Sequence, residues 1–254
     1  MAGSKRQVLD ARSTLPAPLI DDPWTWRVEW VDAAGRAHVE LLGDVRAIDF
    51  SAASPVRTFK SFQRQRNYTG WYFSSTVGRH LRYESLLERA VLRCLDFNPA
   101  VASMATQPLH LWAGGRAHRI PDIAVRQSGS PLTIVDVCPL AFVDKKRRAD
   151  AHALMAAACD ALSWRHEVLS EPDPILAENV GWLAGYRVEP ANCGEVEAEL
   201  RSFGDAFSLR DVDERCEWPA LVRPAVFHLL WTGVLRCDVL AARLSDDTEL
   251  RFAA

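Results

Sequence analysis

Long apolar runs are missing from this sequence of 254 residues. No stretch approaches the roughly 20 consecutive apolar residues that a membrane-spanning helix needs. The first residues include basic side chains, but no apolar segment follows them, so we do not expect a secretory signal. We therefore predict a cytoplasmic protein with no membrane association.

Paired cysteines are missing as well. The chain has 6 cysteines, widely scattered, and no two of them form a Cys-x-x-Cys pair. This spacing argues against a zinc ribbon. Cys94 and Cys159 fall within apolar helical patterns, as reduced buried thiols do. The cysteines therefore predict free thiols in a reducing compartment.

A large excess of one charge is also absent. The chain carries 30 basic and 33 acidic residues, for a formal net charge of -3, and 48% of its residues are hydrophobic. These values are typical of a globular protein with a real core. They exclude a uniformly basic nucleic-acid binder, so any positive surface for nucleic acid must be local.

Acidic residues are missing from one segment, residues 51–83, in which basic and aromatic side chains alternate. Its arginines and lysine are Arg57, Lys60, Arg64, Arg66, Arg79 and Arg82. Such side chains neutralise phosphates and stack on bases or sugars. The alternative is that the aromatics fill the core and the cations are merely solvated. The candidate site that follows in the chain favours nucleic-acid contact.

The hydrophobic patterns predict four parts. Residues 1–23 form a flexible polar arm, and residues 24–82 form an N-terminal β-hairpin followed by the basic and aromatic extension. Residues 83–190 form the core. Residues 191–254 form a small, mainly helical C-terminal domain, whose acidic stretch suits a protein partner better than DNA.

Within the core, a helix over 83–97 precedes three strand-like runs at 107–112, 119–125 and 132–137. A long alanine-rich helix near 144–162 leads to a strand at 165–169 and a helix near 175–185. Short turns predict a meander, and the crossover helix predicts a parallel last strand. The fold class is therefore α/β, with a mixed sheet flanked by helices. Trp182, in an apolar stretch of the last helix, is expected in the core.

Three carboxylates occupy positions suited to a hard divalent cation. Glu88 lies on the helix before the sheet, and Asp122 and Asp136 interrupt two strongly apolar strands. A carboxylate in such a strand is costly unless it is paired, hydrogen-bonded or metal-bound. Each aspartate alone is explained by a solvent-facing strand end, but their recurrence favours a shared Mg²⁺ or Mn²⁺ site. Glu84, one turn before Glu88, is an alternate ligand.

The ordered motifs of residues 83–187 resemble the nuclease domain of TnsA, the endonuclease subunit of heteromeric transposases in the PD–(D/E)xK superfamily. The matching segments are Ser85-Leu86-Leu87-Glu88, Gln107-Pro108-Leu109, Pro121-Asp122, Asp136-Val137-Cys138-Pro139 and Ala177-Glu178-Asn179-Val180-Gly181-Trp182-Leu183.

This resemblance implies a restriction-endonuclease-like fold with Glu88, Asp122, Asp136 and the residue at 138 as the catalytic set. It also implies a metal-dependent enzyme that nicks one strand at transposon ends. A DDE-type transposase would recognise the ends and cut the other strand, and an ATPase regulator is a further implied partner. The C-terminal domain would bind the partner.

One motif position departs from the family pattern. Cys138 stands where the family has a lysine, and a thiol cannot act as a fixed cation. Lys145 or Lys146, which we also predict to contact DNA, is one replacement, and a second metal ion is another. Two other functions stay open: a catalytically silent DNA-binding or scaffold subunit, and a stand-alone restriction or repair nuclease.

Overall fold

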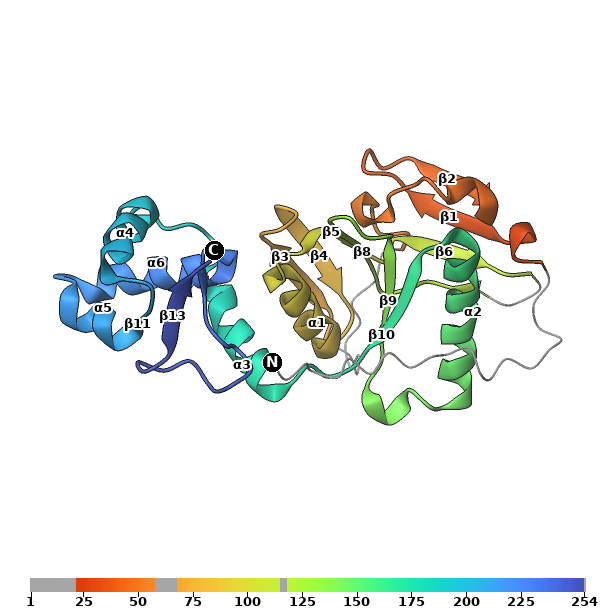
Figure 1. The fold of residues 1–254 in the computed structure, drawn as a ribbon. Coiled ribbons are helices and arrows are strands. Elements are labelled where there is room, and N and C mark those ends of the chain that lie inside the picture. The colour runs from red at the N-terminus through yellow and green to blue at the C-terminus, as the bar shows by residue number, and fades with distance from the viewer. Residues whose placement is uncertain (1–21, 58–67, 115–117, 254) are drawn as a thin grey trace. The chain divides into compact units, whose positions relative to one another are not determined.

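The structure, a computed structural model, describes residues 22–57, 68–114 and 118–253. The predicted arm 1–23 therefore lies almost wholly outside the described residues, as do Lys60, Arg64 and Arg66. The chain divides into two compact units (Figure 1). The first comprises residues 1–91 and 100–171, and the second comprises residues 92–99 and 172–254.

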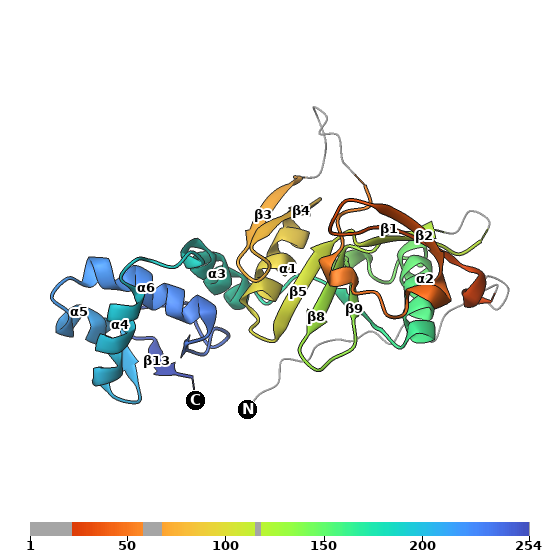
Figure 2. The ribbon, with the colours of Figure 1, turned by 90° about the horizontal axis from the view of Figure 1, so that it is seen from above.

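The first unit contains a mixed four-stranded sheet with the order β10-β9-β8-β5. Its strands are β5 (Val101–Thr106), β8 (Ile123–Gln127), β9 (Thr133–Val137) and β10 (Arg165–Leu169). Figure 2 shows β5, β8 and β9 side by side. Strands β5, β8 and β9 pair antiparallel, whereas β10 pairs parallel to β9 after the crossover helix α2 (Lys146–Leu162). The predicted parallel return of the last strand is confirmed.

The composition of this sheet differs from the meander expected from the sequence. Strand β5 belongs to it, whereas the run at 107–112 contributes β6 (Leu109–Trp112) to a different sheet. Gln107 separates the two strands because its backbone is left-handed, with φ of 50°. A β strand cannot continue through such a residue.

The second sheet of this unit has the order β2-β1-β6-β7. It joins the N-terminal hairpin, β1 (Arg27–Val31) and β2 (Ala37–Leu41), to β6 and the short β7 (His118–Arg119). The hairpin is present as predicted, but it is a structural part of the first unit rather than an extension. Strand β1 has antiparallel partners on both sides, because its buried Val28 faces a shared core.

Residues 70–83 form a separate hairpin of β3 (Gly70–Ser74) and β4 (Arg79–Tyr83), and α1 (Leu86–Phe97) follows it. Short 3-10 helices complete the first unit: η2 (Pro23–Thr25), η3 (Leu42–Val45), η4 (Phe50–Ala52) and η5 (Leu140–Phe142). Helix α2 packs along β10 (Figure 1). Met155, Ala158 and Leu162 of α2 belong to the same buried core as Ile134 of β9. This packing brings one face of α2 to the strand that carries Asp136.

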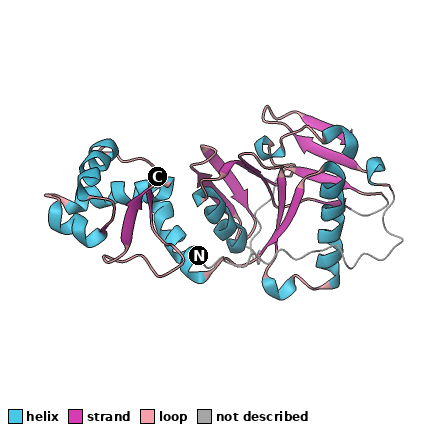
Figure 3. Ribbon diagram, in the orientation of Figure 1, coloured by secondary structure: helices cyan, strands magenta, loops and turns pink. Residues whose placement is uncertain are grey.

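The second unit is mainly helical with a small sheet (Figure 3). Its helices, besides the end of α1, are α3 (Pro174–Leu183), η6 (Ala184–Tyr186), α4 (Cys193–Leu200), η7 (Arg201–Phe203), α5 (Leu209–Arg215) and α6 (Pro219–Thr232). The strands β11 (Phe207–Ser208), β13 (Glu249–Phe252) and β12 (Leu235–Arg236) pair antiparallel in that order. Helix α5 lies within the acidic stretch of the predicted C-terminal domain, and a reciprocal cap between Ser208 and Asp211 begins it.

Asn179 of α3 explains part of the expected Glu-Asn-x-x-Trp-Leu motif in structural terms. Its buried side chain donates to the carbonyl oxygens of Val239 and Ala242 at 2.9 and 2.8 Å and accepts from the amide of Leu244. Asn179 therefore holds the chain that leads to β13. Trp182, expected in the core, is 57% exposed, so that prediction is wrong.

All six cysteines are free. Within the part of the chain that the structure describes, none of the helices combines the length and the apolar character needed to cross a bilayer.

Candidate metal and nucleic-acid site

A pocket of ≈ 700 Å³ opens in the first unit, between the start of α1, the start of α2 and the ends of β8 and β9. Its wall contains three carboxyl groups, those of Glu84, Glu88 and Asp122. Four arginines share the wall: Arg57, Arg119, Arg147 and Arg148. Oxygen ligands for a hard cation thus lie beside cations suited to phosphate.

Glu88 is positioned by the cap of its own helix. Ser85 Oγ accepts from the Glu88 amide at 3.1 Å, and the Glu88 carboxylate accepts from the Ser85 hydroxyl and the Glu84 amide at 3.0 and 2.7 Å. This reciprocal arrangement is a form of the capping box. Burial raises the pKa of Glu88. The Ser-x-x-Glu motif therefore serves the start of α1 and delivers a carboxylate to the pocket.

Asp122 precedes β8 and accepts a hydrogen bond from the Val137 amide at 2.6 Å. Burial, together with the charges of Asp136 and Glu88, raises its pKa to about 8. A buried carboxyl group keeps its proton to a higher pH when the negative charges around it are not fully balanced by nearby cations. A divalent cation in the pocket would relieve that repulsion.

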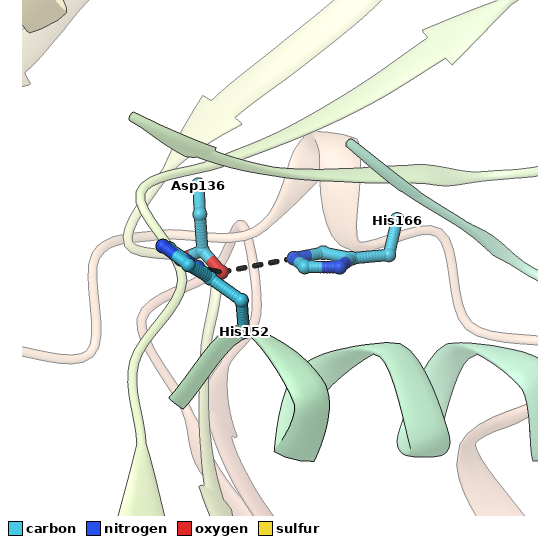
Figure 4. Close-up of side chains that lie close together, drawn as sticks. All are labelled: Asp136, His152 and His166. Carbon is cyan, nitrogen blue, oxygen red and sulfur yellow. Dashed lines mark hydrogen bonds and ion pairs between the residues drawn. The ribbon is translucent and has the colours of Figure 1, made fainter. Parts of the chain in front are cut away.

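Asp136 does not line the pocket among the described residues; its side chain is fully buried. His152 Nδ1 lies 3.1 Å and His166 Nε2 lies 2.9 Å from Asp136 Oδ2 (Figure 4). Oδ1 accepts a hydrogen bond from Arg119. Although burial opposes ionisation, the hydrogen bonds from the two histidines and the charge of Arg119 keep the pKa of Asp136 well below its usual range. Asp136 is thus a paired interior anion.

Arg119 links this buried anion to the pocket. Its side chain is 18% exposed and lies in the pocket wall while it bonds Asp136. Burial works against its charge, but Asp136 and Asp122 outweigh that effect and raise the pKa of Arg119. Asp136, held by two histidines, fixes a permanent cation next to Asp122.

The three carboxylates expected to share a metal therefore divide. Glu88 and Asp122 line one pocket, whereas Asp136 groups with His152 and His166. Neither histidine was singled out from the sequence. His152 lies on the face of α2 that packs on the sheet, and His166 alternates with exposed Arg165 in β10. The sequence could have indicated each histidine as a polar residue on a buried face. That both histidines bond Asp136 becomes visible only in the tertiary structure.

Cys138 is fully buried, and burial raises the pKa of its thiol. It is absent from the described lining of the pocket, as are Lys145 and Lys146, which were expected to replace the missing lysine. Both lysines are exposed, and Lys145 Nζ lies 4.5 Å from the ring centre of Phe142. The cations that α2 brings to the pocket are Arg147 and Arg148. The start of this helix was thus correctly predicted to bring cations to the site. The residues that line the pocket, however, are the two that follow Lys146.

The basic segment 51–83 meets the pocket at one described residue, Arg57, which forms an ion pair with Glu84. Gln107 Nε2 also donates to Glu84, so the Gln-Pro motif supports the pocket edge. Arg79 bonds the Ala53 carbonyl, and Arg82 lies over the ring of Trp71. Lys60, Arg64 and Arg66 are outside the described residues. Nucleic-acid contact by this segment stays a prediction.

No protein-family model matches this chain, and no curated protein matches it either.

Proposed function

We propose that this protein is a metal-dependent DNA endonuclease whose active site is the pocket of Glu88, Asp122 and Arg119. The observation that carries the proposal is the placement of three carboxyl groups and four arginines in one ≈ 700 Å³ pocket, with the pKa of Asp122 raised to about 8. The resemblance of the motifs to TnsA supports the more specific role, nicking of transposon ends beside a DDE-type transposase.

The donor set fits Mg²⁺ or Mn²⁺. Mg²⁺ is commonly held by one or two carboxylates together with waters and substrate phosphate, and Glu88 and Asp122 supply that number. When bound, such a cation polarises the phosphate and lowers the pKa of a coordinated water. Asp136 is not needed as a ligand in this proposal.

The chain's own cations supply the rest of the chemistry. Arg119, fixed by Asp136, stabilises negative charge that develops on the scissile phosphate, which is the role left open by Cys138. Arg147 and Arg148 at the start of α2, together with Arg57, orient the DNA backbone. The site reads phosphate rather than base sequence, so a partner must direct it to its target.

The test is cleavage of duplex DNA in Mg²⁺ or Mn²⁺, with and without a DDE-type transposase. We expect Asp122→Asn and Glu88→Gln to abolish nicking, and the exposed Asp144→Asn to leave it unchanged as the matched control. Cleavage without any partner would favour the stand-alone nuclease. Cleavage that persists in Asp122→Asn would refute the assignment.

A silent DNA-binding or scaffold subunit is the second candidate. It is favoured by Glu88, whose two carboxylate oxygens are both engaged in capping α1. This candidate predicts DNA binding by the parent protein with no cleavage in either metal, even with the partner present.

A further inference from the structure

A second cluster of metal-binding side chains lies outside the pocket, where Asp136, His152 and His166 converge (Figure 4). They come from β9, α2 and β10, and their side chains are 0%, 4% and 6% exposed. One oxygen and two imidazole nitrogens all lie within 4.8 Å of one another. We propose that this cluster binds one Zn²⁺-like transition-metal ion, which cross-links the three elements.

The spacing of the donor atoms suits a small tetrahedral ion. Asp136 Oδ2 is 3.1 Å from His152 Nδ1 and 2.9 Å from His166 Nε2. With metal–ligand bonds of about 2.0–2.1 Å, a tetrahedral Zn²⁺ spaces its ligands by roughly 3.3 Å. The two contacts of Asp136 therefore need to open by only a few tenths of an ångström, while the two histidine nitrogens, which lie within 4.8 Å of each other, must be brought to the same spacing. The three side chains then supply three of the four ligands of a tetrahedral ion.

The chemistry of the cluster selects against hard cations. Two of the three donors are imidazole nitrogens, which suit Zn²⁺, Co²⁺ and Ni²⁺ rather than Mg²⁺ or Ca²⁺. Arg119 occupies Oδ1 of Asp136 and offsets its charge, so little electrostatic attraction remains for an ion that binds through charge alone. Glu88 and Asp122 in the pocket offer only oxygen ligands and therefore prefer hard cations such as Mg²⁺.

The hydrogen bonds of the metal-free protein allow the two imidazoles to change tautomer and bind such an ion. Because an ionised Asp136 only accepts, each histidine donates a proton to Oδ2. His152 Nε2 has no hydrogen-bond partner in the described part of the chain. The proton of His152 can therefore move to Nε2 when a metal takes Nδ1, and His166 must likewise pass its proton from Nε2 to Nδ1 or release it to solvent, so metal binding at this cluster weakens as the pH falls. Arg119 stays on Oδ1 and orients the coordinating carboxylate, as outer partners of metal sites do.

The test uses the full-length protein, stripped of metal and titrated with CoCl₂ and then ZnCl₂ alone. Visible absorption of tetrahedral cobalt reports the site, and calorimetry gives the stoichiometry. We expect one tetrahedral ion per chain, distinct from any octahedral ion held by the carboxyl groups of the pocket, and a rise in Tm on binding. His152→Asn and His166→Gln keep an N–H donor for Asp136 but lose the imidazole, so each should weaken Co²⁺ binding more than about 100-fold. Glu88→Gln should leave the visible spectrum of tetrahedral cobalt and its titration midpoint unchanged.

Folding of both variants is checked by circular dichroism. The proposal is overturned if the folded parent binds neither ion stoichiometrically, or if the folded variants bind Co²⁺ as the parent does. Should the variants not fold, X-ray absorption of the Zn²⁺-loaded parent decides. A shell with two imidazole nitrogens and a carboxylate oxygen supports the cluster, and a shell of oxygen alone or one dominated by sulfur overturns it. None of these readouts requires nuclease activity, so the result stands apart from the proposed function.

Discussion

At the scale of single residues, the ion pair of Arg119 with Asp136 distinguishes this site from the one expected from the sequence motifs. The sequence predicted a triad of carboxylates and a missing lysine. In the structure, the third carboxylate, Asp136, is buried and paired, and the cation that it holds reaches the pocket. The charge that Cys138 cannot supply is thus present on Arg119 of β7, a strand that belongs to the other sheet of the first unit.

Replacement of Arg119 is therefore expected to impair cleavage more than replacement of the lysines. Arg119→Ala should lower the single-turnover nicking rate by about 10²–10³, the usual cost of one charge-stabilising group. The double substitution of Lys145 and Lys146 by Ala is the matched control and should lower only DNA affinity. Equal rates for parent and Arg119→Ala, with Mn²⁺ bound in both, would remove Arg119 from the mechanism.

The raised pKa of Asp122 predicts a dependence of stability on pH. Its pKa of about 8 in the folded protein lies above the usual value near 3.9. Below pH 4 both states are protonated, whereas between pH 4 and pH 8 only the folded state keeps the proton. The free energy of unfolding should therefore fall as pH rises, by up to about 4 kcal/mol between pH 5 and pH 8.

Urea denaturation in EDTA at several pH values measures this effect. Asp122→Asn should remove the pH-dependent loss, and the exposed Asp144→Asn should retain it. A parent protein whose stability is flat from pH 5 to pH 8 would show that Asp122 is ionised in the folded state.

At the scale of the elements, the long periodic segments could be predicted from the sequence, but the partners of short strands could not. The apolar periodicity of α1 and α2 and the parallel return of β10 are confirmed. Strand β5 was missed because Val101–Thr106 mixes buried and exposed positions without strict alternation. The left-handed Gln107 has no sequence signature of the kind that glycine provides.

The candidate site could likewise be predicted from the sequence only in part. Glu88 and Asp122 could be found because a motif and an apolar strand surround them. Arg119 and His166 could not, since their roles depend on contacts between β7, β9 and β10. Trp182 shows the converse: it lies in a mostly apolar helix, but the apolar sequence around it did not identify the side that faces solvent.

The cap of α1 links element stability to the pocket. Ser85→Ala removes the acceptor for the Glu88 amide and the hydroxyl donor to its carboxylate. We expect a loss of about 1 kcal/mol in unfolding free energy, measured by thermal or urea denaturation. Ser85→Thr keeps the hydroxyl and should restore most of it. A Ser85→Ala protein as stable as the parent would show that the cap is not formed in solution.

At the scale of the whole molecule, the two compact units do not follow the four parts predicted from the sequence. The second unit begins at residue 172 and includes residues 92–99, so α3 lies outside the first unit although its motif was assigned to the core. Val180 and Leu183 of α3 are fully buried in the second core, and Phe97 of α1 packs against it. The reason is that the apolar faces of α3 and α6 cover each other.

Deletion of residues 191–254 should therefore be damaging. It would expose Val180 and Leu183, at a cost of roughly 3–6 kcal/mol, and leave an apolar helix end at Phe97. We expect the shortened chain to aggregate, as judged by size-exclusion chromatography. A monomeric product with a cooperative thermal transition would contradict the division into these units.

The claim on which the account depends is that Glu88 and Asp122, rather than Asp136, provide the site for a hard divalent cation. Mn²⁺ titration of the metal-free protein, followed by electron paramagnetic resonance of the free ion, tests this directly. The account predicts that Asp122→Asn and Glu88→Gln each abolish Mn²⁺ binding, whereas folded His152→Asn binds Mn²⁺ as the parent does. Mn²⁺ binding that survives both acidic substitutions, or that is lost only with the histidine, would contradict it.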